Sequence, residues 1–213
     1  TPQLSNLTLV QEVPNEKDGY SAIADFDLDG DQDAFVISTP PGINIRGQVS
    51  FYVWDVQTNN VISPRGSVYS FLGSFATPAI GYLNTDNSPD VVFNTRDSIY
   101  AFAYSANQWS RIFQIANMDM SGMAGLSVYD FNGDGRDEVL IRNEQFFWIL
   151  NGETGAIIFS YPCPTGTGYE YPTVADIDGD LEAELLFSCD GQLICLEAAP
   201  GSWTFTRPVW NQL

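Results

Sequence analysis

The chain has 213 residues, of which 27 are acidic and 8 are basic, and its formal net charge is −19. Such an acidic surface repels nucleic acid and anionic lipid, so neither is expected as a direct partner. The sequence has no histidine, which excludes the Ser-His-Asp triad and histidine-ligated zinc. It also has no run of about eighteen apolar residues, so no membrane insertion is expected.

The chain begins with an apolar-rich stretch at residues 4–13 that predicts a strand. Four units of strands follow it, so this strand is surplus to them. We interpret residues 1–19 as a strand of a neighbouring blade, which favours part of a longer propeller over a closed ring of four blades.

The first unit, residues 20–76, contains an acidic stretch at 25–33, here named loop one. Oxygen-bearing side chains occupy its positions 1, 3, 5 and 9, and hard ligands at alternate positions of a tight turn suit Ca²⁺. The assigned ligands are the side chains of Asp25, Asp27, Asp29 and Asp33 and the carbonyl of Asp31. Strands are expected at 20–24, 34–38, 48–55 and 67–71.

The second unit, residues 77–121, repeats the pattern in a weaker form at 82–90, here named loop two. Asn84, Asp86 and Asp90 keep the oxygen-bearing positions, but Tyr82 stands at position 1 and Asn87 at position 6. Asn tolerates a left-handed backbone, so the turn is expected to persist while metal affinity falls. Strands are expected at 79–83, 91–94, 98–104 and 110–116.

The third unit, residues 122–165, carries loop three at 130–138. Its assigned ligands are the side chains of Asp130, Asn132, Asp134 and Glu138 and the carbonyl of Arg136. Strands are expected at 125–129, 139–142, 145–150 and 156–161.

The fourth unit, residues 166–208, carries loop four at 176–184. Its assigned ligands are the side chains of Asp176, Asp178, Asp180 and Glu184 and the carbonyl of Glu182. Leu181 holds position 6, where a positive φ would cost about 1 kcal/mol or more, so another turn shape is expected here. Strands are expected at 173–175, 184–188, 192–197 and 202–206.

The loops begin at residues 25, 82, 130 and 176, which are 57, 48 and 46 residues apart. A period near fifty residues with several strands per unit is typical of propellers. The sequence therefore predicts one all-β domain, a β-propeller or propeller segment with four four-stranded blades. All four loops should emerge on one face of it.

Of two competing interpretations of the loops, the EF-hand fails and a magnesium site is disfavoured. An EF-hand needs a bidentate Glu at position 12, but that position is Val36, Ile141 or Phe187, each in a predicted strand. Magnesium keeps its waters and is rarely held by all-protein cages. We therefore expect Ca²⁺ in loops one, three and four, with loop two a weaker fourth candidate. Because protein fills the positions around the ion, its expected role is structural rather than catalytic.

The stretches Val128-Tyr-Asp-Phe-Asn-Gly-Asp-Gly135 and Val174-Ala-Asp-Ile-Asp-Gly-Asp180 resemble FG-GAP/VCBS repeats of calcium-binding β-propellers. The resemblance covers the chain from about residue 20 to its end. Tyr169-Glu-Tyr-Pro172 and Thr206-Arg-Pro-Val-Trp-Asn-Gln212 are similar to repeats in very large secreted surface proteins of gliding, Bacteroidota-type bacteria. The family includes integrin-like adhesion heads, lectins and some polysaccharide lyases, so the resemblance implies a fold and not one function.

The chain has three cysteines. Cys163 lies between units three and four, and Cys189 ends a strand of unit four, so both are expected on the face away from the loops and could form a disulfide. The alternative is three reduced thiols. Cys195 falls mid-strand and is interpreted as a small buried apolar residue. The tryptophans that recur about once per unit should pack one blade on the next; they are Trp54, Trp109, Trp148 and Trp203.

These features favour a non-catalytic binding or adhesion module that is secreted or held at the cell surface. Millimolar calcium and a persistent disulfide both suit that setting. The face opposite the calcium loops is expected to present loops to a carbohydrate or protein ligand. Two alternatives remain, a calcium-assisted polysaccharide lyase or hydrolase, and a structural repeat of a surface filament that contacts further blades or subunits.

Overall fold

The computed structural model describes residues 12, 19–38, 47–70, 76–164, 166, 168 and 170–207. Within these residues all regular secondary structure is β-strand, and no helix that could span a membrane occurs. Two predictions fall outside the described residues, namely the strand at 4–13, apart from Glu12, and the last residue of the strand at 67–71.

The described strands form four antiparallel sheets, here named blades one to four. Blade one contains β1 (Gly19–Ala24), β2 (Asp33–Ser38), β3 (Gly47–Asp55), β4 (Asn60–Val61) and β5 (Gly66–Ser70). Blade two contains β6 (Ala79–Gly81), β7 (Asp90–Asn94), β8 (Ser98–Ser105) and β9 (Gln108–Ala116). Blade three contains β10 (Leu126–Tyr129), β11 (Glu138–Arg142), β12 (Phe146–Leu150) and β13 (Ile157–Pro162). Blade four contains β14 (Thr173–Ala175), β15 (Glu184–Cys189) and β16 (Gln192–Leu196).

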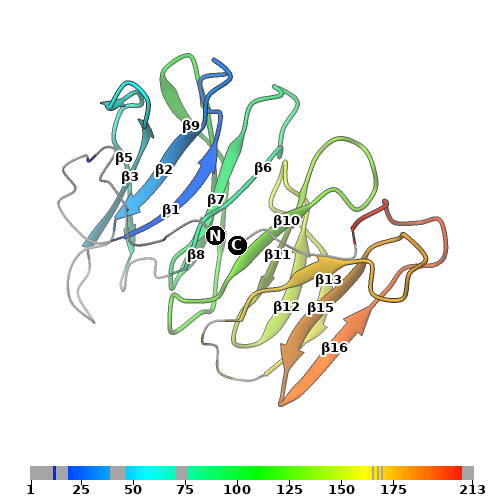
Figure 1. Ribbon diagram of the computed structural model, residues 1–213. Helices are drawn as coiled ribbons and strands as arrows, with labels where there is room; N and C mark the ends of the chain where they lie inside the picture. Colours follow the sequence, from blue (N-terminus) through cyan, green and yellow to red (C-terminus); the bar gives the residue numbers. More distant parts are fainter. Residues whose placement is uncertain are drawn as a thin grey trace, which may run out of the picture.

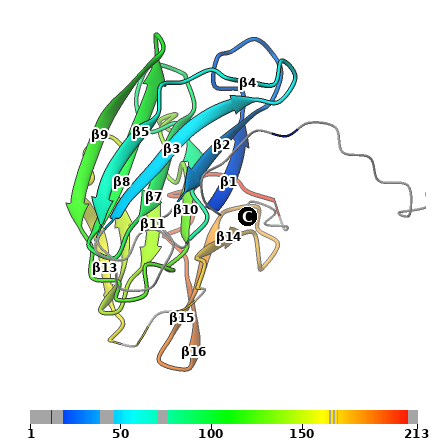
Figure 2. The ribbon, with the colours of Figure 1, turned by 90° about the vertical axis from the view of Figure 1, so that its left-hand side faces the viewer.

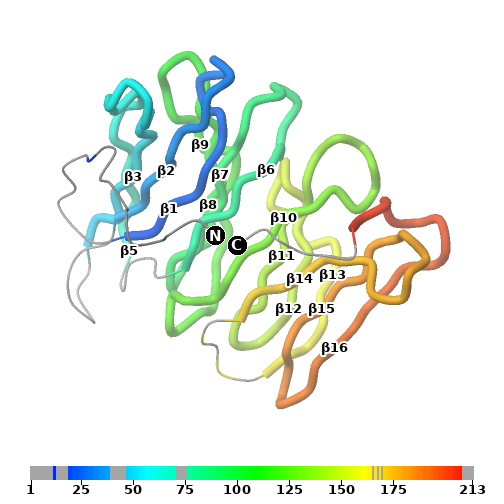
Figure 3. Tube along the Cα trace, in the orientation of Figure 1, coloured from blue at the N-terminus to red at the C-terminus, as the bar shows by residue number. Residues whose placement is uncertain are grey.

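Each blade is an antiparallel meander in which strands pair in chain order, except that β4 and β5 both pair with β3. The blades lie side by side in an arc, with blade one and blade four at its ends (Figure 1). The chain runs from blade to blade in sequence order (Figure 3). The first strands lie on one side of the arc and the outer strands β5, β9 and β13 on the other (Figure 2). The predicted all-β, propeller-like fold is confirmed.

Three apolar clusters lie between consecutive blades and hold the arc together. Between blades one and two, Phe51 packs against Phe102 with ring centroids 4.9 Å apart. Between blades three and four, Phe147 stacks on Phe187 at 4.1 Å. Burying such rings stabilises a fold through their large apolar area and their contact geometry. The blades therefore form a rigid frame from which the connecting loops project.

Two of the four tryptophans pack directly on an aromatic ring of the preceding blade, as predicted. Trp109 of blade two meets Phe35 and Phe51 edge-on, and Trp203 packs on Phe131 at 4.5 Å. Trp148 packs against the cluster between blades two and three. Trp54 instead donates its indole N–H to Asn59 of its own blade.

The strand predicted at 202–206 is wrong. Blade four has three strands among the described residues, and the segment makes only an isolated bridge between Glu182 and Phe205. Its backbone crosses towards blade three, where the amide of Thr204 donates to the carbonyl of Phe131 at 2.9 Å. The contact between Trp203 and Phe131 holds the segment there, away from β16.

The prediction that Cys195 is buried is also wrong, because its side chain is exposed. Its neighbours on β16, Ile194 and Leu196, pack against the cluster between blades three and four. Because side chains alternate along a strand, Cys195 points to the opposite face of blade four, together with the exposed Leu193.

Candidate metal centres

The four acidic loops join the first strand of each blade to its second strand, as predicted. Loop one joins β1 to β2, loop two joins β6 to β7, loop three joins β10 to β11, and loop four joins β14 to β15. In Figure 1 the four loops project from the same side of the arc. The rigid blades therefore position four related turns on one face.

Loop one brings three predicted ligands together. The carboxylates of Asp25, Asp27 and Asp29 offer oxygens that all lie within 4.8 Å of one another. The amides of Asp29 and Gly30 donate to the two oxygens of Asp25 at 3.1 and 3.0 Å, and the amide of Asp31 donates to Asp29 at 2.9 Å. These bonds fold the backbone around the carboxylates, whose remaining lone pairs could bind a cation.

Loop four repeats this arrangement. Oxygens of Asp176, Asp178 and Glu184 lie within 4.8 Å of one another. Asp176 accepts from the amides of Gly179 and Leu181 at 2.7 and 3.2 Å, and the second of these bonds is the counterpart of the bond from Gly30 to Asp25. The two remaining predicted ligands pair with each other, since the amide of Glu182 donates to Asp180 at 2.8 Å.

Loop three has the same bonds but a different charge balance. Asp130 accepts from the amides of Gly133 and Gly135 at 2.7 and 2.9 Å, and Asn132 replaces a carboxylate at position 3. The Arg136 side chain lies 3.2 Å from Asp134, and its hydrogen bond holds the pKa of that carboxyl below its usual value. Such an exposed ion pair contributes little stability by itself, but it offsets part of the loop's negative charge.

Position 4 shares a left-handed backbone with position 6 in three of the loops. Positive φ occurs at Leu28 and Gly30 of loop one, at Gly133 and Gly135 of loop three, and at Gly179 and Leu181 of loop four. The expectation that Leu181 gives loop four another shape is therefore wrong. The hydrogen bond from its backbone amide to Asp176 stabilises a φ of 76°, although a left-handed leucine costs about 1–2 kcal/mol.

The left-handed backbone at position 4 was not predicted. Glycine at that position in loops three and four was the available signal, and Leu28 of loop one obscured it. Loop two has Thr85 there without a positive φ, although Asn87 at position 6 does have one, as predicted.

The carboxylate at position 9 is buried in every loop; these residues are Asp33, Asp90, Glu138 and Glu184. Each accepts a hydrogen bond from the amide at position 2 of its loop, at 2.6–2.9 Å. Burial raises the pKa of Asp33 to about 6 and the pKa of Asp90 and Glu138 to about 7. A negative charge is costly at these positions, and a nearby cation would offset that cost.

Loop two departs from the others at its first position. In place of a carboxylate, the Tyr82 backbone exchanges two hydrogen bonds with Asp137 of loop three, at 2.7 and 2.8 Å. Its remaining predicted ligands bond to one another, since the Asn84 amide group donates to Asp90 at 3.1 Å and the Asp86 amide donates to Asn84 at 2.7 Å. Loop two thus joins blades two and three through Asp137, a partner that was not predicted.

The donor sets of loops one, three and four fit a hard divalent cation. They consist of carboxylate, amide and carbonyl oxygens, which Ca²⁺ and Mg²⁺ prefer, and they contain no nitrogen or sulfur ligand. Several carboxylates within one turn repel one another without a cation. The acidic clusters of loops one and four could therefore hold a metal ion, and loop three offers the same backbone frame.

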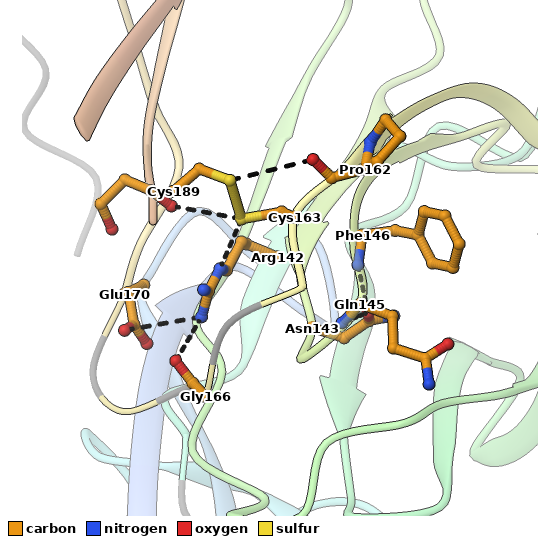
Figure 4. Close-up of a disulfide and its surroundings, with 10 residues drawn as sticks. Arg142, Asn143, Gln145, Phe146, Pro162, Cys163, Gly166, Glu170 and Cys189 are labelled. Carbon is orange, nitrogen blue, oxygen red and sulfur yellow. Dashed lines mark hydrogen bonds and ion pairs between the residues drawn. A yellow bond between two sulfur atoms is a disulfide. The ribbon is translucent and has the colours of Figure 1, made fainter. Parts of the chain in front are cut away.

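The other end of blade four carries the predicted disulfide between Cys163 and Cys189 (Figure 4). Strand β15 begins at loop four and ends at Cys189, so the disulfide lies away from the acidic loops. The buried Arg142 donates from Nε to the sulfur of Cys163 at 3.3 Å and from Nη1 to the carbonyl of Gly166 at 2.9 Å. This contact fixes the segment between blades three and four.

The fold and its loops define a propeller-like protein whose blades each carry an acidic hairpin. Residues 82–141 and 130–187 each match the FG-GAP-like repeat. Over these residues the chain belongs to the FG-GAP-like repeat family, as the sequence predicted. No curated protein matches the chain in sequence.

Solved structures share the fold at low sequence identity. The V. cholerae biofilm matrix protein Bap1 matches 87% of this chain with a TM-score of 0.53 and 22% identity. Rhamnogalacturonan lyase YesW matches 90% with a TM-score of 0.58 and 15% identity, and the exotype lyase YesX matches 89% with 0.57 and 16%. This chain spans 31% of the Bap1 chain, 40% of YesW and 38% of YesX. These likenesses concern the fold alone.

Proposed function

We propose that this chain is a calcium-stabilised, non-catalytic binding module of a secreted or cell-surface protein. The observation that carries this proposal is the recurrence of one hydrogen-bonded, oxygen-rich turn in loops one, three and four. Calcium suits these turns better than magnesium, because it accepts more ligands in flexible geometry and needs fewer waters. Calcium bound there would supply positive charge that offsets the clustered carboxylates.

The aspartate at position 1 of each loop would shape the ion site, because it accepts hydrogen bonds from backbone amides of the loop. Those amides belong to the turn itself, so the same side chain shapes the hairpin and faces the cation. The buried carboxylates at position 9 would close each site from the strand side. These residues hold and position the loop, and no general base or nucleophile is needed for that role.

The proposed setting is extracellular. Free calcium there is millimolar, which suits exposed sites of modest affinity. The disulfide between Cys163 and Cys189 persists in an oxidising compartment. The face opposite the acidic loops is proposed to bind a carbohydrate or protein ligand, as in an adhesion module.

Affinity electrophoresis and a lyase assay together test this proposal. The protein is run in calcium through gels containing pectin, alginate or rhamnogalacturonan, and the same polymers are incubated with it in solution. We expect retarded migration in at least one polymer, with no rise in ultraviolet absorbance from unsaturated product. A rise proportional to protein concentration would contradict the non-catalytic role.

A further inference from the structure

Two tryptophans occupy equivalent places in the arc. Trp109 and Trp203 each lie 27 residues after the first residue of their unit's acidic loop. Each packs on aromatic rings of the preceding blade, Trp109 on blade one and Trp203 on blade three. The surroundings of Trp109 therefore show what a completed site at this place looks like.

At the first site a peptide segment covers the tryptophan. The indole Nε1 of Trp109 donates to the carbonyl of Pro64 at 2.8 Å, and the hydroxyl of Tyr104 donates to the carbonyl of Ile62 at 2.8 Å. The side chain of Ile62 packs against the cluster between blades one and two. Residues 62–64 thus fill this end of the interface with an apolar residue, a small residue and a proline.

This segment is a bulge in the outer strand of blade one. Trp54 pairs with Val61 and Phe51 pairs with Gly66, so four outer-strand residues stand opposite two residues of β3. Blade three has a smaller bulge, in which Ile158 alone is the extra residue of β13. The outer strand of blade three is therefore too short to cover Trp203 as blade one covers Trp109.

A pocket of about 330 Å³ remains beside Trp203. Its apolar walls are formed by Phe131, Ile149, Ile158, Phe159 and Trp203. Ile149 is the structural counterpart of Val53, because each pairs with the residue ten positions after the start of its unit's loop. In blade one, the carbonyl of Val53 accepts from the amide of Ile62, and the amide of Val53 donates to the hydroxyl of Ser63. The pocket beside Ile149 therefore lies at the place that residues 62–64 occupy in blade one.

The rim of the pocket is unusually apolar for an outer strand. Ile157, Ile158 and Phe159 of β13 are 50%, 57% and 38% exposed. The exposed positions of β9, the corresponding strand of blade two, are mostly polar, with Gln108 and Arg111 among them. A pocket with an exposed apolar edge strand beside it is the arrangement that accepts an extended peptide.

Few polar groups in the pocket could recognise a sugar. Asn132, Glu138 and Ser202 border it, and the first two bond to each other at 3.2 Å. Among the described residues the Trp203 indole N–H makes no hydrogen bond, whereas the Trp109 indole N–H donates to the carbonyl of Pro64. The pocket thus offers apolar walls and an indole that retains a donor, which suit a peptide carbonyl flanked by apolar side chains.

We propose that this pocket binds an extended segment of a partner protein that carries an apolar residue two positions before a proline. The indole of Trp203 donates to a carbonyl of that segment, and the apolar residue enters between Ile158 and Phe131. A basic residue after the proline, as Arg65 follows Pro64, matches the chain's net charge of −19. This inference goes beyond the proposed function, because the pocket lies beside loop three and not on the opposite face.

Titration of the full chain with a synthetic peptide tests the proposal. The probe has the sequence of residues 60–66, which contains Ile62, Pro64 and Arg65. We expect the NMR signal of the Trp203 indole N–H to shift and saturate. A peptide carrying Pro64→Gly should bind more weakly, because proline restricts the free peptide to extended conformations.

Two neighbouring variants provide a matched comparison. Ile158→Arg places a charge at the pocket wall and should lower the affinity for the peptide by about tenfold or more. Ile157→Arg changes the adjacent exposed residue, which does not line the pocket, and should leave affinity unchanged. Both positions are half exposed, so neither variant should prevent folding.

The proposal is overturned if the indole signal stays fixed at saturating peptide, if both variants lose affinity equally, or if oligosaccharides shift the signal and the peptide does not. These outcomes leave the calcium role untouched, because that role is measured by stability and metal content.

Discussion

Withdrawal of calcium by a chelator is expected to lower the midpoint of thermal unfolding by about 15 °C or more. Calcium at a hundred times its dissociation constant stabilises the folded chain by about 2.7 kcal/mol at each site. Loops one, three and four would each contribute, and a kilocalorie corresponds to roughly 2–4 °C in a chain of this size. The measurement is calorimetry or circular dichroism with excess calcium and with excess chelator.

Single substitutions show whether the effect comes from the loops. Asp25→Asn keeps the size of the side chain but removes the charge that would face the ion, so it should destabilise the chain in calcium. In chelator the same change should cost clearly less, because relief of the repulsion among Asp25, Asp27 and Asp29 offsets the loss of one of the two acceptors for the loop amides. Asp190→Asn alters an exposed turn at the other end of blade four and is the matched control. Equal losses with and without calcium for Asp25→Asn would contradict the proposed role.

Removal of the disulfide is the second large effect. The double variant Cys163→Ala/Cys189→Ala is expected to lose about 3–4 kcal/mol, because the bond closes a loop with a sequence separation of 26. The loss should be visible as a lower urea midpoint with a somewhat steeper slope, because the unfolded chain is no longer held compact by the cross-link. The buried Arg142 also loses its contact with the sulfur of Cys163, which adds to the cost.

The third cysteine provides the control for this experiment. Cys195 is exposed and free, so Cys195→Ala should change stability by no more than about 0.5 kcal/mol. Thiol titration of the unfolded wild-type chain should find one reactive cysteine without reductant and three with it. Three thiols without reductant, or an unchanged urea midpoint in the double variant, would show that the bond does not form.

The acidic loops and most strands could be predicted because both depend on local patterns. Alternating apolar residues indicate a strand wherever they occur, and oxygen-bearing residues at positions 1, 3, 5 and 9 bend the chain through bonds to nearby amides. The shape of loop four shows how strong those bonds are. Leu181 takes a left-handed backbone because Asp176 accepts from its amide, although leucine alone disfavours that conformation.

The failures of prediction concern contacts between distant segments. Residues 202–206 alternate apolar and polar side chains whether they pair with β16 or cross to blade three, and only the packing of Trp203 on Phe131 decides between them. The exposure of Cys195 likewise depends on which face of β16 packs on blade three, and Ile194 and Leu196 take that face. The pocket beside Trp203 depends on the relative sizes of bulges in blades one and three, which no local pattern records.

Calcium content per chain is the most direct test of the central claim. The protein is equilibrated by dialysis against a buffer that contains calcium and competing magnesium. The number of calcium ions bound per chain is then measured by mass spectrometry. We expect three calcium ions per chain, one each in loops one, three and four, and two after Asp25→Asn. A chain that retains no calcium, or that loses none with Asp25→Asn, would contradict the claim that these acidic turns are calcium sites.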